Sequence, residues 1–329
     1  MFIDFLRPKG VKLRLQELQI QGVSEYDVKL VVVPSALSKP TVISSSNIGT
    51  HEFIWGARTY VMGVVNVTPD SFSGDGVLSA IGDVQSAIDQ ALRMEDEGAD
   101  VIDIGGESTR PVSIYPDAQP ISDDDEISRV VPVIEGLISR LNIPISIDTR
   151  KASVAQVAVR AGAALINDVS MMEDSQMIRV ISDMDVPIIL SHIRKNGHGE
   201  DILNEVIDDL RGAVKDLKKA KISQSKIIID PGIGFAKNAE QSIALLRDIH
   251  RFRAEFELPV LIGTSRKSFI GSVTNEFVED RRFGTAATVA WAVTGGVDIV
   301  RVHDVLEMVK VVKMSDTLAR DFRSGASLA

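Results

Sequence analysis

The chain contains no cysteine among its 329 residues. This absence excludes disulfide frameworks, thiolate zinc sites, iron–sulfur clusters and cysteine nucleophiles, and it is compatible with a reducing compartment. The chain also lacks any run of about 18 apolar residues, the length needed to span a membrane as a helix, and its first residues do not show the charged-then-apolar layout of a secretory signal. We therefore expect a cytoplasmic protein with no membrane partner.

Positive charge is in deficit as well: Lys and Arg number 36 against 46 Asp and Glu, which gives a net charge of −10. Proteins that track nucleic-acid phosphates usually carry a basic excess, so we expect no nucleic-acid partner. The motifs G-x-G-x-x-G, H-E-x-x-H and G-x-S-x-G and the P-loop are also missing, which argues against dinucleotide-binding, zinc-protease, serine-hydrolase and P-loop chemistry.

What the chain does contain is a regular alternation from about residue 60 to 305. Eight short apolar runs rich in β-branched residues are separated by stretches of helical periodicity, such as 83–98 and 122–141. The runs lie at 60–67, 101–104, 143–147, 164–166, 186–190, 226–229, 260–263 and 298–302. They are nearly continuously hydrophobic, as buried parallel strands are. The pattern predicts an α/β fold of the (β/α)8 (TIM) barrel type, with an open doubly wound sheet as the alternative.

Residues 1–50 do not follow this alternation, and we predict a short N-terminal extension of unknown role. Residues 51–329 are predicted to form the barrel domain. Within that domain, residues 51–60 place Trp55-Gly56 between two short apolar arms. This arrangement predicts a hairpin that covers the bottom of the barrel.

Acceptor side chains follow four of the predicted strands. Asp103, Asp148 and Asp230 stand at equivalent strand ends, and Asn167 stands at a fourth. Catalytic groups of a barrel gather at the C-terminal ends of its strands. One such Asp is equally compatible with capping a helix, but four converging acceptors predict a pocket for an amino-substituted heterocycle.

Cationic side chains follow other predicted strands, namely Arg110, Lys267, Arg301 and His303. Above a barrel rim such groups predict an anion site, most naturally for a phosphate or a diphosphate. Asn66 ends the first strand and is suited to donate one oxygen to a Mg²⁺ ion that a diphosphate already holds. The remaining loop cations are expected to be solvated, namely Arg150, Lys151 and Arg266.

Seven segments carry a resemblance to a known family. They are NVTPDSFS (66–73), DIGGESTRP (103–111), SIDTRK (146–151), NDVS (167–170), DPGIGF (230–235), GTSRKSFIG (263–271) and RVHDV (301–305). In this order they closely resemble the dihydropteroate synthases, and the resemblance covers about residues 58–320. It implies a transferase of folate biosynthesis, built on a pterin-binding barrel. Such an enzyme condenses 6-hydroxymethyl-7,8-dihydropterin diphosphate with p-aminobenzoate to give 7,8-dihydropteroate and diphosphate. The resemblance further implies a magnesium ion and a homodimer.

The resemblance also assigns residues to roles. The pterin site comprises Asp103, Asp148, Asn167, Asp230 and Lys267. The diphosphate site comprises Asn66, Arg110, Arg301 and His303, with Asn66 as the magnesium ligand. The p-aminobenzoate pocket, where sulfonamides bind, comprises Phe72, Thr109, Pro111, Phe235, Lys267 and Ser268. The catalytic set is Arg110, Asp148, Lys267 and Arg301.

The chain departs from the family pattern in two loops and two strand ends. Residues 73–76 read SGDG where SDGG is usual, and Val112 replaces a glycine in a stretch to residue 121 that is longer than is common. We expect these loops to close differently and to alter the affinity for p-aminobenzoate and sulfonamides. Residues 191–193 read SHI for the usual MHM, and residues 171–172 read MM for GG. These two changes are expected to repack the pocket wall.

Two other functions compete with this interpretation. A pterin-dependent methyltransferase on the same barrel shares the acceptor residues but needs no diphosphate site, so Arg110, Lys267 and Arg301 together argue against it. A non-catalytic pterin-binding homologue is expected to have lost site residues, and none is lost outright.

Overall fold

Eight parallel strands form one sheet at the centre of the protein. The computed structural model describes residues 45–67, 80–107, 120–194, 197–199 and 201–320. The strands are β3 (Tyr60–Asn66), β4 (Val101–Gly105), β5 (Ile145–Asp148), β6 (Leu165–Asp168), β7 (Ile188–Ser191), β8 (Ile227–Asp230), β9 (Leu261–Ile262) and β10 (Ile299–Val302). Their order in the sheet is β8-β7-β6-β5-β4-β3-β10-β9, and a parallel bridge between Ile229 and Val260 joins the two edges. The predicted barrel is confirmed, and the open-sheet alternative is wrong because the edges meet.

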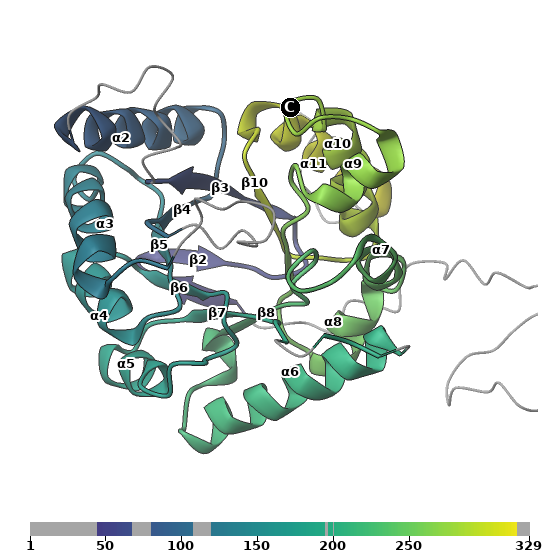
Figure 1. The fold of residues 1–329 in the computed structure, drawn as a ribbon, viewed down its shortest axis with the longest axis horizontal. Coiled ribbons are helices and arrows are strands. Elements are labelled where there is room, and N and C mark those ends of the chain that lie inside the picture. The colour runs from purple at the N-terminus through teal and green to yellow at the C-terminus, as the bar shows by residue number, and fades with distance from the viewer. Residues whose placement is uncertain (1–44, 68–79, 108–119, 195–196, 200, 321–329) are drawn as a thin grey trace, which may run out of the picture. The chain divides into compact units, whose positions relative to one another are not determined.

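Helices surround the strands in chain order (Figure 1). They are α2 (Ala80–Asp96), α3 (Asp123–Leu137), α4 (Ala152–Ala161), α5 (Met177–Met184), α6 (Ile202–Lys219), η1 (Gln224–Lys226), α7 (Ala239–Arg247), α8 (His250–Phe256), α9 (Ser268–Thr274), α10 (Arg282–Thr294) and α11 (Val305–Ala319). Ser122 caps the start of α3, because its Oγ accepts a hydrogen bond from the Asp125 amide at 3.1 Å. A capping oxygen satisfies an amide that the helix itself leaves unpaired.

Residues alternate between the two faces of each strand, as the period of two requires. On β4, Ile102 and Ile104 pack in the large cluster between strands and helices, while Val101 belongs to the cluster inside the barrel. Asp103, two residues after Val101, is fully buried on the same inner face. The lower interior is therefore apolar, and the layer above it holds the polar residues that end the strands.

A hairpin closes the N-terminal end of the barrel, but not the one that the sequence predicts. Strands β1 (Ser46–Ile48) and β2 (His51–Phe53) pair, and the chain reverses at Gly49, whose φ is +58°. The structure forms no hairpin over 51–60, because β2 pairs with β1 and a turn over 55–58 separates it from β3. Trp55 packs in the barrel cluster with Ile48 and Tyr60. The Trp55 indole donates to the Ser46 Oγ at 2.8 Å, which fixes the hairpin against the turn that leads into β3. The predicted extension lies largely outside the described residues.

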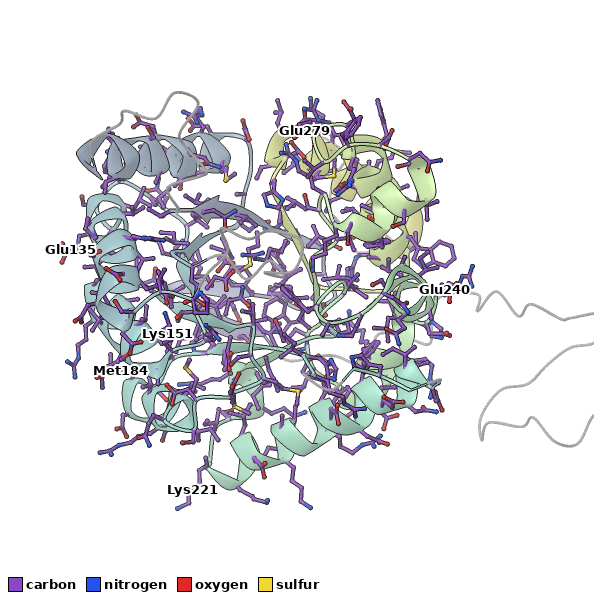
Figure 2. All side chains as sticks on the ribbon, viewed as in Figure 1. Glu135, Lys151, Met184, Lys221, Glu240 and Glu279 are labelled. Carbon is purple, nitrogen blue, oxygen red and sulfur yellow. The ribbon has the colours of Figure 1, made fainter. Side chains whose placement is uncertain are left out.

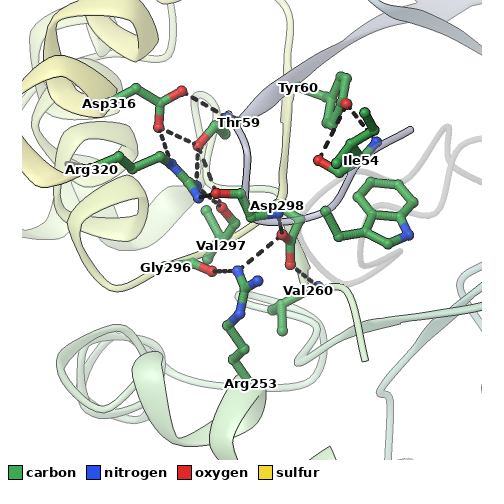
Figure 3. A network of polar contacts seen from close by, with 12 residues as sticks. Ile54, Thr59, Tyr60, Arg253, Val260, Gly296, Val297, Asp298, Asp316 and Arg320 are labelled. Atoms are coloured by element: carbon green, nitrogen blue, oxygen red, sulfur yellow. Dashed lines mark hydrogen bonds and ion pairs between the residues drawn. The ribbon is translucent and has the colours of Figure 1, made fainter. Parts of the chain in front are cut away.

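A buried polar network joins the starts of the strands at the same end (Figure 3). Asp298 accepts hydrogen bonds from the Val260 amide and the Arg253 guanidinium, both at 3.0 Å. Asp316 of α11 accepts from the Thr59 amide at 2.7 Å. In this fold the N-terminal end typically serves stability, while the C-terminal end carries function.

Charged side chains cover the outside of the helices (Figure 2). Glu135 on α3, Lys221 after α6 and Glu240 on α7 are exposed and point away from the strands (Figure 2). No helix within the described ranges is both long and apolar enough to cross a membrane.

Candidate functional site

Five predicted site residues come together at the C-terminal ends of the strands. Asp103 lies on β4, Asp148 ends β5, Asn167 lies on β6, Asp230 ends β8 and Arg301 lies on β10. Four of them follow an inward-facing apolar residue by two positions in the sequence, and Asp148 follows the buried Ser146. Because the strands are parallel and closed into a ring, these inward-facing positions meet at one end of the barrel.

Arg301 lies between two carboxylates. Its Nε donates to the Asp103 Oδ2 and its Nη2 to the Asp148 Oδ2, both at 2.6 Å. The Asn167 amide donates to the same Asp103 Oδ2 at 2.9 Å. Burial opposes the charge of Arg301, but the two carboxylates outweigh burial and raise the pKa of its guanidinium. One hydrogen-bonded network therefore joins four strands of the barrel.

The other oxygens of this network lack partners. Asp103 Oδ1, Asp148 Oδ1, Asn167 Oδ1 and the Ser146 Oγ are buried without a hydrogen-bond partner in the described chain. Buried polar atoms are nearly always paired, because leaving one unpaired costs its lost hydration. Four such oxygens on three neighbouring strands indicate a pocket that awaits the N–H donors of a ligand.

Asp148 is the residue in this pocket whose protonation is most perturbed. Burial raises its pKa from 3.8 to about 7, and the nearby Asp103 adds to the rise, while Arg301 opposes it. A carboxylate with a pKa near 7 exchanges its proton at neutral pH, and a group so perturbed inside a pocket is a candidate functional residue.

Asp230 is held at both of its oxygens. Its Oδ1 accepts from the Gly232 amide at 2.8 Å, and its Oδ2 accepts from the Ser191 Oγ at 3.1 Å. A carboxylate oxygen accepts more than one hydrogen bond, so these contacts orient Asp230 and still leave it able to bind a ligand. The loop after β8 is thereby tied to its own strand end.

Lys267 and Phe235 meet beside Asp230. The Lys267 Nζ lies 4.2 Å from the centroid of the Phe235 ring, within the range of a cation–π contact, and it donates to the Ile233 carbonyl. Burial lowers the pKa of Lys267 to about 8, and Asp230 limits the fall. Ser268 follows as the exposed first residue of α9. Three residues predicted to shape one pocket are thus brought together.

The remaining predicted residues divide into two groups. The His303 ring approaches the Ser265 Oγ at 3.0 Å, and Asn66 is half-buried at the end of β3, in register with Gly105 of β4. The other four lie outside the described residues, so their roles stay predictions: Phe72, Thr109, Arg110 and Pro111.

Sequence reasoning missed three residues near the site and misplaced one. Ser146 and Ser191 face inward, and the strand period gives a signal for both, since Ser146 precedes Asp148 by two positions. Lys237 is buried near His192, and no strand-end pattern points to it. The prediction of a solvated Lys151 is wrong, because its Nζ contacts Glu107 and Glu126 at 2.6 and 2.8 Å. Arg150 and Arg266 stay partly exposed but form ion pairs with Glu107 and Asp304.

Comparisons with known proteins place the chain in one family. The sequence profile of the pterin-binding enzymes matches residues 62–303. The chain is 45% identical over 262 residues to the dihydropteroate synthase of Bacillus subtilis, covering 79% of this chain and 89% of that protein.

Solved structures of the Xanthomonas albilineans dihydropteroate synthase are also similar. The structure with 4-aminobenzoic acid is 36% identical with a TM-score of 0.78, and covers 84% of this chain and 98% of that one. The structure with 7,8-dihydropteroate is 35% identical with a TM-score of 0.75, and covers 84% of this chain and 100% of that one. The chain therefore belongs to the pterin-binding enzyme family and, within it, to the dihydropteroate synthases.

Proposed function

We propose that the chain is a transferase that condenses 6-hydroxymethyl-7,8-dihydropterin diphosphate with p-aminobenzoate to give 7,8-dihydropteroate and diphosphate. The observation that carries the proposal is the set of buried, unpartnered oxygens on β4, β5 and β6, next to Arg301. A pterin offers ring and amino N–H donors on one edge, which these acceptors can satisfy. The Xanthomonas relative with bound 7,8-dihydropteroate supports the same product for this chain.

The pterin pocket is set up to accept planar N–H donors. The Arg301 guanidinium already donates to Asp103 and Asp148 in this way, and the free Oδ1 atoms of both residues remain for a ligand. The substrate diphosphate would compete with the two carboxylates for Arg301. Binding of both ends of the substrate then replaces one set of charge-assisted hydrogen bonds with another.

The reaction breaks the bond between the exocyclic carbon of the pterin and a diphosphate oxygen. The same carbon then bonds to the amine nitrogen of p-aminobenzoate, which loses one proton. Positive charge grows on the pterin as the first bond breaks, and the carboxylates of Asp103 and Asp148 stabilise it. Negative charge grows on the leaving diphosphate and is stabilised by the cationic set, namely Arg110, Lys267, Arg301 and His303. A dissociative substitution follows from this separation of charge.

Asn66 is the proposed ligand for a magnesium ion bound to the diphosphate. Among the described residues no group of three or more His, Asp or Glu side chains is placed to hold a metal on its own. A single amide oxygen at a strand end nevertheless fits an ion that keeps several waters and binds chiefly through substrate phosphates. When bound, the ion would offset charge on the leaving diphosphate.

The p-aminobenzoate pocket is proposed beside the loops after β8 and β9. Phe235 offers a ring face, Lys267 a cation for the carboxylate and Ser268 a hydroxyl at the start of α9. The rest of the proposed pocket, Phe72, Thr109 and Pro111, lies outside the described residues. Sulfonamides resemble p-aminobenzoate in shape and charge, so we expect them to compete for this pocket, with an affinity that depends on the altered loops.

A homodimer in the cytoplasm is also proposed. Most of the large apolar side chains that the described chain exposes lie on or beside α9, α10 and α11: Val273, Phe277, Phe283, Trp291, Leu306, Met314 and Leu318. An apolar face of this kind favours association with a second copy. The double variant Phe283→Glu/Leu318→Glu should be a monomer by light scattering. The control is Ile138→Glu, which alters an exposed apolar residue directly after α3 and should leave the mass unchanged. A monomeric parent protein would contradict the proposal.

The direct test is an assay with both substrates and Mg²⁺, read out as dihydropteroate formed. Lys267→Met is expected to lower turnover by orders of magnitude, since it removes the cation beside Asp230. A chain that binds pterin but forms no dihydropteroate would be a non-catalytic homologue. Methyl transfer from methyltetrahydrofolate to a corrinoid in place of condensation would indicate the methyltransferase instead.

A further inference from the structure

Lys237 is a buried lysine that lies outside the substrate pocket. It follows the loop after β8, and only 9% of its surface is exposed. Its Nζ contacts four acceptors: His192 Nδ1 at 3.0 Å, the carbonyls of Gly232 and Phe235 at 3.0 and 3.1 Å, and the carbonyl of His192 at 3.3 Å. An ammonium has only three hydrogens to donate, so every donor is used within this cluster.

Within this cluster, His192 is oriented by contacts at both of its ring nitrogens. Burial lowers the pKa of Lys237 to about 7, and Asp230 opposes the fall. In its charged form Lys237 only donates, so the His192 Nδ1 then accepts and the Nε2–H donates to the Asp209 carboxylate at 3.1 Å. Burial lowers the pKa of His192 to about 4, and Lys237 adds to the fall. The imidazole is therefore neutral at physiological pH, with one fixed tautomer that presents an acceptor to Lys237.

The loop held by Lys237 is tightly constrained. Gly232 has a φ of +66°, and a Cβ added there would lie 1.9 Å from the carbonyl oxygen of His192. Ala236, just before Lys237, has a φ of +49°, in the left-handed region that residues with a Cβ disfavour. Such a conformation persists where surrounding contacts over-determine it, and the four contacts of Lys237 provide them.

The same loop also contacts Lys267, a residue of the proposed active site. The Ile233 carbonyl accepts from Lys267, the Phe235 ring lies under the Lys267 Nζ, and a Cβ on Gly234 would lie 2.9 Å from the Lys267 Cδ. Lys237 and Lys267 thus bind carbonyls of one loop: Lys237 binds those of residues 232 and 235, and Lys267 binds that of residue 233. A shift of the loop would move Phe235 and Lys267 together.

We propose that Lys237 is a positioning residue for the p-aminobenzoate half of the reaction, because it fixes the loop of residues 231–236 that presents Phe235 and supports Lys267. The inference rests on the proposed function. Lys237 makes no hydrogen bond to the pterin acceptors on β4, β5 and β6. It reaches Lys267, which both substrate sites share, only through the loop carbonyls. We therefore expect its main effect on the second substrate and a smaller effect on the pterin.

The first test is the kinetics of Lys237→Met, which keeps the side-chain length and removes the donors. The KM for p-aminobenzoate should rise roughly 10- to 100-fold, as a displaced positioning group can cause. The KM for the pterin diphosphate should stay within about two-fold, because a ground-state binding loss appears only in the substrate affected. Equal rises in both KM values, or no rise in either, would overturn the proposal.

A double-mutant cycle with Phe235→Leu shows whether Lys237 acts through Phe235. In the Phe235→Leu background, adding Lys237→Met should change the KM for p-aminobenzoate by less than about two-fold, since coupled residues are not additive. Independent, multiplicative effects would contradict the mechanism. Lys226→Met is the matched control, because Lys226 donates to the Asp185 carbonyl at 2.6 Å near the start of β8, and its kinetics should equal those of the parent.

Two further measurements separate the possible failures. If Lys237→Met does not fold, Lys237→Gln replaces it, because the shorter amide keeps two N–H donors. The KM for p-aminobenzoate should again rise more than the KM for the pterin diphosphate, but by a smaller factor than in Lys237→Met. The parent enzyme is assayed in parallel. An inactive parent refutes the proposed function. An active parent whose variants change both KM values equally, or neither, refutes only the role of Lys237.

Discussion

Asp148 carries a charge that the folded protein disfavours, and this gives its reaction a pH dependence. Its pKa is raised to about 7, chiefly by burial. Only the ionised form of Asp148 stabilises positive charge on the pterin, so kcat/KM should rise with pH through about 7. Above that range kcat/KM should fall again, because Lys267, whose pKa burial lowers to about 8, loses its charge. Asp148→Asn should lower kcat/KM by roughly 100-fold or more and abolish this acid limb. Initial rates from about pH 5 to 9 measure both effects.

The control for this prediction is Asp208→Asn, which alters an exposed carboxylate on α6. Its pH profile should match that of the parent enzyme. If Asp148→Asn kept an acid limb with the same midpoint, another group would be responsible, and the assignment of Asp148 would be wrong.

The backbone conformation of Met171 and Met172 is a feature that the sequence does not predict. The sequence indicates that they replace two glycines and repack the pocket wall. The structure gives them φ values of 59° and 58° and packs both against the hydrophobic core between strands and helices. The buried Asp168 carboxylate accepts from the Ser170 and Met172 amides at 2.7 and 2.6 Å and holds this turn. Methionine disfavours that backbone conformation, so the pattern alone cannot foretell it.

At the scale of elements, the loop after β8 depends on glycine at one position. Gly232 has a φ of +66°, and an added Cβ would meet the His192 backbone at 1.9 Å. Gly232→Ala should therefore destabilise the fold by roughly 3 kcal/mol or more, because backbone must move. Gly212→Ala is the control: Gly212 lies inside α6 with nothing within 4 Å of an added Cβ, so it should stabilise by about 0.5–1 kcal/mol. Urea unfolding measures both, and similar changes in the two variants would contradict the structure.

A cluster of ion pairs around Lys151 joins the end of β4 to α3 and α4. Lys151, just before α4, donates to the Glu107 and Glu126 carboxylates at 2.6 and 2.8 Å and to the Ile121 carbonyl at 2.7 Å. Figure 2 shows it on the inner side of the helices. The Glu126 side chain is only 1% exposed, so Lys151→Met would leave a buried carboxylate without its cation. The expected loss of unfolding free energy is about 3–5 kcal/mol.

Lys219→Met provides the comparison for this loss. Lys219 pairs with Asp216 on α6, where both side chains are more than half exposed, and such pairs contribute about 0–1 kcal/mol. Chemical unfolding at neutral pH should separate the two variants clearly. A loss of less than about 1 kcal/mol in Lys151→Met would show that Glu126 finds another partner or accepts a proton.

At the scale of the whole molecule, the sequence predicts the barrel well because one signal repeats eight times. The strand period and the polar strand ends place Asp103, Asn167 and Arg301 correctly. Contacts between distant segments leave no such repeat. Trp55 packs in the cluster inside the barrel, and Lys237 contacts His192, which lies 45 positions earlier in the chain. Local sequence patterns therefore predict neither the observed hairpin nor the contacts of Lys237.

The stability of the whole molecule should respond to pH through two buried groups of opposite sign. Asp148 has a folded pKa of about 7 against 3.8, so the folded state holds more protons there. Its contribution is fully present below pH 3.8 and is lost as pH rises through about 7, a change on the order of 4 kcal/mol. His192 has a folded pKa of about 4 against 6.5. Its contribution is present above pH 6.5 and is lost as pH falls through about 4, on the order of 3 kcal/mol.

The two contributions oppose each other between about pH 4 and 7, so the parent protein alone would hide them. Asp148→Asn and His192→Asn expose them one at a time, and asparagine keeps an acceptor near the position of the His192 Nδ1. Relative to the parent, the free energy of unfolding of Asp148→Asn should increase as pH rises, whereas that of His192→Asn should decrease. Urea unfolding at several pH values measures both slopes, and subtracting the parent curve removes the titration of groups that do not interact with the replaced side chain. Slopes of the same sign would show that burial does not perturb the two groups in opposite senses.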